Sequence, residues 1–123
     1  MNESILNNVK RMVGVDPSLT VFDLQIITHI NSVFSRLYTL GVGPESGFMI
    51  EDQGPEWDTF LLGDKRQNMI KSYMYLSVRI LFDPPQTGPL MNAMQAQIEK
   101  MEWLINVTRE GDSWRDPSLP AIP

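Results

Sequence analysis

The 123-residue sequence predicts an all-α fold, a small bundle of about four helices. Four segments carry apolar residues at helical spacing, and glycines or Asp-Pro pairs separate them. The most apolar one, "MIKSYMYLSVRILF" from Met69, is too long for an ordinary strand and is rich in helix formers. The length suits one domain, so we expect helices in residues 1–110 and an extended Pro-rich arm in residues 111–123.

The first two helices are predicted by their apolar stripes. Asn2 or Ser4 could cap the first helix, and Gly14 ends it. Its apolar positions are Ile5, Leu6, Val9, Met12 and Val13. The second helix ends at Gly41, and Thr20 with Asp23 resembles a capping box at its start. Its stripe is Phe22, Ile26, Ile30, Val33, Leu37 and Leu40, widened by Ile27, Phe34 and Tyr38.

Residues 41–67 predict a long ordered loop between the second helix and the next long one. This segment holds five glycines, two prolines and six of the fifteen acidic residues. We expect a short strand at "FMI" from Phe48 and a helical turn whose Trp57, Phe60 and Leu61 reach the core. A loop of this length is often functional.

The third and fourth long helices are predicted on either side of a proline-rich corner. The third should begin near Asp64 or Lys65 and end at Phe82, because Asp83 precedes Pro84. Its apolar residues surround the helix, which indicates burial on more than one side. The fourth should start near Pro89 and end at Gly111. Its bundle-packing seam is Met91, Met94, Ile98, Met101, Ile105 and Thr108.

The composition argues against an enzyme, and we expect no catalytic, cofactor-binding or metal-binding residue. There is no cysteine, and the only histidine, His29, lies on a polar helix face with no partner for a triad or a zinc site. The "GVGPESG" segment lacks the spacing and the lysine of a phosphate loop. The net charge of −5 is unfavourable for non-specific DNA binding. We also expect no signal peptide and no membrane span.

Protein contact is the remaining function, and tryptophan and arginine are typical anchors of protein interfaces. Trp103 either caps the bundle or contacts a partner. Trp114 and Arg115 lie in the arm, away from any predicted core, and are better candidates for contact.

The chain resembles the small head–tail connector proteins of tailed bacteriophages, also called adaptors or head-completion proteins. The segments that carry the resemblance are "HINSVFSRLYTLGVGPESGF" from His29, "W..FL" at Trp57 to Leu61, "YMYLSVRILFDPP" from Tyr73, and "MEWLINV" from Met101. It covers about residues 1–110 and leaves the arm unmatched.

The resemblance implies a helical connector domain without catalysis or a cofactor. It implies a homo-oligomeric ring, normally of twelve copies, under the portal protein at the capsid vertex of the virion, assembled in the host bacterial cytoplasm. The ring would extend the channel through which genomic DNA passes without sequence-specific binding. It would also dock the next head-completion (stopper) or tail protein. No membrane is involved.

The resemblance also implies roles for named residues. The arm would engage the portal or a neighbouring subunit through Trp114, Arg115, Leu119 and Ile122. Loops at the other end would face the next ring or the channel, with candidates Glu45, Phe48, Glu51, Asp52 and Trp57. Candidates for packing between subunits are Tyr73, Tyr75, Arg79 and Trp103. The alternative is a small helical DNA-packaging or regulatory binding protein, which the acidic charge and the lack of a basic recognition helix disfavour.

Overall fold

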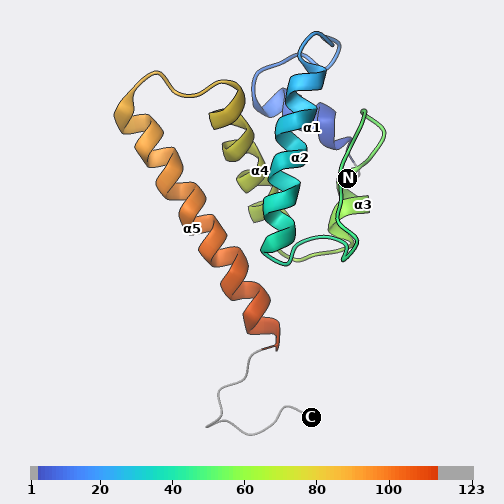
Figure 1. Ribbon diagram of the computed structural model, residues 1–123, viewed down its shortest axis with the longest axis vertical. Helices are drawn as coiled ribbons and strands as arrows, with labels where there is room; N and C mark the ends of the chain where they lie inside the picture. The colour runs from blue at the N-terminus through green and yellow to red at the C-terminus, as the bar shows by residue number, and fades with distance from the viewer. Residues whose placement is uncertain (1–2, 114–123) are drawn as a thin grey trace, which may run out of the picture.

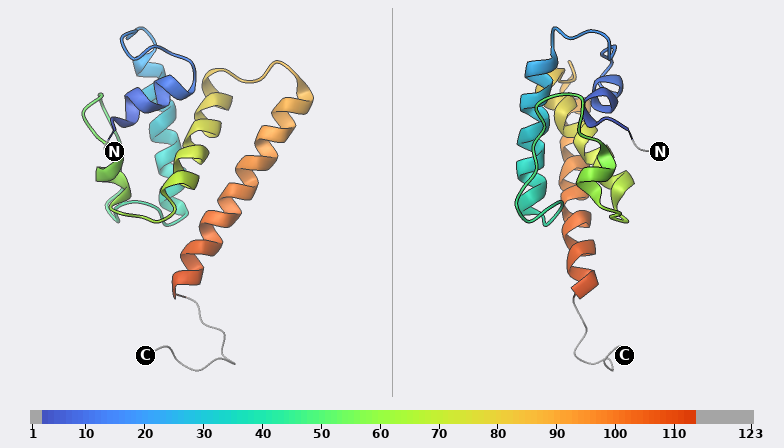
Figure 2. Two further views of the ribbon diagram at one scale, coloured as in Figure 1. Left: turned by 180° about the vertical axis from the view of Figure 1, so that it is seen from behind. Right: turned by 90° about the vertical axis from the view of Figure 1, so that its right-hand side faces the viewer.

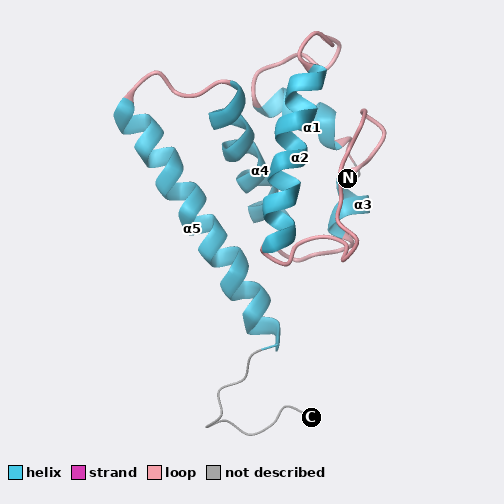
Figure 3. Ribbon diagram, viewed as in Figure 1, coloured by secondary structure: helices cyan, strands magenta, loops and turns pink. Residues whose placement is uncertain are grey.

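A computed structural model describes the backbone of residues 3–113 and the side chains of residues 3–107. Over this range the chain forms five helices and no strand, as Figures 1 and 3 show. The elements are α1 (Ile5–Met12), α2 (Asp23–Thr39), α3 (Trp57–Leu61), α4 (Gln67–Phe82) and α5 (Gly88–Ser113). The predicted all-α bundle is confirmed, with α3 as a short fifth helix.

Helix α1 is capped as predicted by Ser4, whose hydroxyl accepts a hydrogen bond from the Asn7 N–H at 3.3 Å. Its buried face carries an ion pair as well as apolar side chains. The Lys10 ammonium lies 2.7 Å from an Asp23 carboxylate oxygen and donates to the Pro17 carbonyl at 2.9 Å. The predicted capping box is absent, because α2 begins at Asp23 with Phe22 as its N-cap residue, and the Asp23 carboxylate pairs with Lys10 instead.

Helix α2 supplies the middle of the core. Its buried residues are Ile26, Ile30, Val33, Phe34 and Leu37. Phe22 and Tyr38, which the sequence pattern also assigned to the apolar stripe, are 38% and 51% exposed. Phe22 still packs edge-on against Phe82 of α4, with ring centroids 5.5 Å apart.

The loop after α2 is ordered, but "FMI" is not a strand. The Asn31 side chain accepts from the Ile50 N–H at 2.8 Å and donates to the Ile50 carbonyl at 2.9 Å, so a side chain replaces the partner strand. Phe48 packs beside the aromatic rings of Phe34 and Phe60. Trp57 and Phe60 reach the core as predicted, and both are buried.

Helix α4 is the central element. It contacts α1, α2 and α5, which explains why apolar residues surround it. Ile70, Tyr73, Met74 and Val78 are buried, and the helix ends at Phe82, before Asp83 and Pro84, as predicted.

Helix α5 lies against α4 at one edge of the molecule, and the two diverge towards the corner that joins them (Figures 1 and 2). Met94 and Ile105 are buried on the predicted seam, with Ile98 and Met101 partly buried. The helix continues through Gly111 to Ser113, so the predicted stop at Gly111 is two residues early.

Candidate assembly surfaces

Three side chains from three helices fix the C-terminal half of α5. Arg36 of α2 donates two hydrogen bonds to the Glu102 carboxylate of α5, at 3.1 and 3.0 Å. The buried Tyr73 hydroxyl of α4 donates to the same carboxylate. Hydrogen bonds from Arg36, and secondarily from Tyr73, lower the pKa of Glu102. Burial is the main reason that the pKa of Tyr73 is raised, and its bond to Glu102 adds to the effect.

A second arginine, just before α4, also holds the C-terminal half of α5. Arg66 donates to the Ile105 carbonyl at 3.1 Å and pairs with Asp64 at 2.7 Å. The hydrogen bond from Arg66 lowers the pKa of the Asp64 carboxyl. With both arginines bound to it, α5 packs its apolar seam against the bundle and leaves the opposite helix face exposed.

The outer face of α5 is apolar around Trp103. This side chain is 63% exposed and lies opposite the buried Ile105, so it does not cap the bundle. Val107, one turn later, is 41% exposed. Lys100, one turn earlier, is exposed and forms no ion pair with any residue from 3 to 107.

The other candidates for packing between subunits lie on α4. Arg79 donates to the Tyr75 hydroxyl at 3.2 Å and to the Asp83 carbonyl at 3.3 Å, and both side chains are partly exposed. Tyr73 is 2% exposed, so it belongs to the core and has almost no surface to offer a neighbour.

The five candidates in the acidic loop divide between surface and core. Glu45, Glu51 and Asp52 are exposed. Trp57 is fully buried, and its indole N–H donates to the Asn8 amide oxygen at 2.9 Å, so it is structural. Phe48 is partly buried against the core.

The loop also spans both ends of the bundle. Glu45 lines the hollow at the end of α2. Because α2 and α5 run in the same direction (Figure 1), this is also the end of the bundle where α5 finishes. Glu51 and Asp52 lie beside the start of α2, at the opposite end. The acidic loop therefore contributes residues to both ends of the bundle, and the assignment of Glu45, Glu51 and Asp52 to the next ring or the channel stays a prediction.

A groove of about 450 Å³ opens between the start of α2 and the loop. The residues that line it are Leu6, Thr20, Asp23, Leu24, Ile27, Glu51, Asp52 and Gln53. Leu24 is 80% exposed at its edge. Leu24 was not among the predicted site residues, although its position away from the apolar stripe of α2 is a sequence signal for an exposed leucine.

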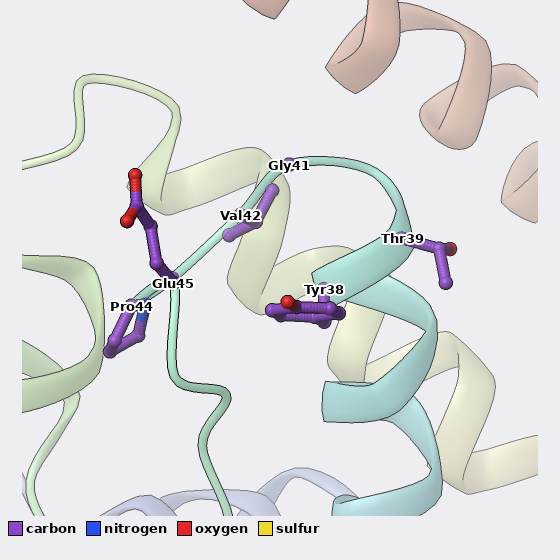
Figure 4. A pocket seen from close by; sticks show the side chains of 7 residues that line it. Tyr38, Thr39, Gly41, Val42, Pro44 and Glu45 are labelled. Atoms are coloured by element: carbon purple, nitrogen blue, oxygen red, sulfur yellow. The ribbon is translucent and has the colours of Figure 1, made fainter.

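The larger hollow, about 710 Å³, lies at the end of α2 and is lined by residues 38, 39 and 41–45. Figure 4 shows that the Thr39 side chain points away from Glu45, the only charged residue of the lining. The polar groups do not converge on one point, so this hollow lacks the arrangement of an active site.

The described residues also show no metal site. No group of histidine and acidic side chains among residues 3–107 could hold a metal ion. His29 is half-buried rather than solvated, and its Nε2 accepts no hydrogen bond from the described residues. His29 lies seven residues after Phe22, which packs on α4, and seven residues before Arg36, which bonds to α5. It therefore lies on the face of α2 that is directed towards α4 and α5. Over residues 3–113 no helix combines the length and apolarity that crossing a bilayer requires.

The arm candidates Trp114, Arg115, Leu119 and Ile122 lie outside the described residues.

A comparison with protein-family models matched residues 5–112 to the family described as "Phage connector protein". Comparisons with curated proteins and with solved structures found no match. The family match covers all five helices except the last residue of α5. The chain therefore belongs to the phage connector protein family.

Proposed function

We propose that this protein is a structural head–tail connector subunit that forms a ring, of twelve copies, beneath the portal of a tailed phage. Membership of the connector family carries the proposal, because it implies a structural rather than enzymatic role at the head–tail interface of the virion. It also implies contact with portal or tail components.

The surfaces of the bundle support a subunit that has neighbours. Trp103, Val107 and Leu24 are exposed apolar residues of the kind that protein contacts cover. On this proposal Trp103, with Tyr75 and Arg79, contributes to packing between subunits. The arm, with Trp114, Arg115, Leu119 and Ile122, engages the portal or a neighbouring subunit.

The proposed ring extends the DNA channel and docks the next head-completion or tail protein. An exposed carboxylate such as Glu45 would let DNA pass without adhering, because like charge repels the phosphates. A basic channel lining in the assembled ring would contradict this role.

The decisive experiment mixes the purified protein with the portal of the same phage and images the product by electron microscopy. We expect a collar of twelve subunits below the portal. Absence of any complex with that portal would overturn the proposal.

A further inference from the structure

The bundle presents two different exposed surfaces on opposite sides. The outer face of α5 forms one edge of the molecule (Figures 1 and 2). The groove is lined by residues of α1, α2 and 51–53, and α1 and α2 lie on the other side of α4 from α5 (Figure 1).

The outer face of α5 carries apolar side chains and one cation, with Glu99 at the border that this face shares with α4. Ala96, Trp103 and Val107 are exposed and follow one another at spacings of seven and four residues, so they share one face. Lys100 lies among them, and no described carboxylate pairs with it.

The groove has the complementary character. Leu24 and Ile27 of α2, with Leu6 of α1, supply apolar walls, and Glu51 and Asp52 supply a negative rim. Glu51 forms no ion pair with a described residue, and Asp52 accepts only the Gly54 N–H of its own turn, at 2.8 Å. Its volume of about 450 Å³ is ample for an aromatic side chain.

We infer that the outer face of α5 in one copy packs into the α2–loop groove of the next copy. Trp103 enters the apolar part of the groove, and Lys100 faces Glu51 and Asp52. A ring requires this kind of contact, in which two different patches meet head to tail. The inference rests on the proposed ring and identifies the surfaces that build it.

Cross-linking tests the pairing directly, because the natural chain has no cysteine. The full-length chain carrying both Trp103→Cys and Leu24→Cys is assembled on the portal, oxidised and run on denaturing gels. We expect a ladder of covalent multimers. Both positions are exposed, so the variant should keep the melting temperature of the wild type within a few degrees.

The matched control is Trp103→Cys with Ser32→Cys. Ser32 is exposed two turns after Leu24 on the same face of α2, about 12 Å along the helix. A disulfide needs Cβ atoms about 4 Å apart, so this pair should give no ladder. A ladder from the control alone would overturn the inference in favour of another register. Dimers from the chain that carries only Trp103→Cys would overturn it in favour of a symmetric contact.

A charge reversal gives an independent test. Lys100→Glu should weaken ring association about two- to fivefold, and adding Glu51→Lys and Asp52→Lys to that chain should restore it. Trp103→Ala should weaken it about thirtyfold. If the two loop substitutions fail to restore association, the proposed charge contact is wrong.

Failure of the two proposals can be told apart. If the unmodified chain does not bind the portal, the connector proposal fails and the pairing fails with it. If it forms the collar but the Trp103→Cys and Leu24→Cys chain gives no ladder, only the pairing fails.

Discussion

At the residue scale, charged side chains that are distant in sequence join the helices. Lys10 and Asp23 connect α1 to α2, and Arg36 and Glu102 connect α2 to α5. No sequence pattern predicts these pairs, because residues 36 and 102 are 66 positions apart and meet only after α4 has positioned both helices. The Arg36–Glu102 pair also orients the outer face of α5, because Glu102 lies next to Trp103.

We predict that Glu102→Gln lowers the free energy of unfolding by about 1 kcal/mol at pH 7, because it removes the charge that Arg36 and Tyr73 bind. The folded pKa of Glu102 is lowered, so its contribution is present above the unfolded pKa and is lost as the pH falls through the folded pKa. Urea unfolding from pH 7 to pH 2.5 should show the difference from wild type shrinking below about pH 4. Glu99→Gln, an exposed neighbour, is the control and should have little effect. A difference that stays constant to low pH would contradict the role of this charge.

We predict that Asp23→Asn costs about 2–4 kcal/mol, because it leaves the Lys10 ammonium, only 1% exposed, without its counter-charge. Adding Lys10→Met should recover much of the loss by removing the buried charge. Thermal and urea unfolding measure both effects, with the exposed Asp58→Asn as a control that changes little. Equal stability of Asp23→Asn and the control would show that the buried pair is unimportant.

At the element scale, the sequence predicted which segments are helices and which helix is central. The apolar stripes identified α2, α4 and α5, and the apolar circumference of α4 correctly indicated burial on several sides. Periodicity could not reveal that Asn31 would hold Ile50 in place of a strand, since this depends on tertiary contact. It also could not show that Tyr73 lies in the core rather than at an interface, because an aromatic residue suits both equally well.

The first turn of the loop after α2 gives an element-scale prediction. Gly43 has φ of +90°, and a Cβ atom there would lie 2.5 Å from Phe60 Cε1. Phe60 is 1% exposed among other aromatic rings and has no room to move. Gly43→Ala should therefore cost both backbone strain and overpacking, about 2–4 kcal/mol.

Gly47→Ala is the matched control for this substitution. Gly47 has φ of +88° but no atom within 4 Å of the added Cβ, so it carries the backbone strain alone. Its cost in urea unfolding should be about 1–2 kcal/mol. Equal costs at the two positions would mean that contact with Phe60 does not matter.

At the scale of the whole molecule, residues 3–107 hold no metal-binding group, and the exposed apolar and acidic side chains that could make contacts lie on the outside of the bundle. Family membership makes this protein a phage connector, and α5 and the acidic loop are the surfaces on opposite sides that an assembly could use. The sequence indicated Trp103 and the acidic loop. It could not pair them, because the relative position of two surface patches depends on the complete fold.

We predict that deleting Asp112–Pro123 leaves the bundle folded but prevents attachment to the portal. The deletion removes only the last two residues of α5, beyond the bonds to Arg36 and Arg66, so the melting temperature should change by only a few degrees. Circular dichroism measures folding, and co-sedimentation with the portal measures attachment. Undiminished attachment would exclude the arm as the portal contact.

The proline corner between α4 and α5 has a practical use. Gln86 is exposed, lies in the connection between α4 and α5, and belongs to a chain without cysteine. Gln86→Cys would therefore give every subunit one spin label at an equivalent point. In any closed ring, the ratio of the two shortest label-to-label distances depends only on the number of copies, so pulsed electron paramagnetic resonance could count subunits in solution.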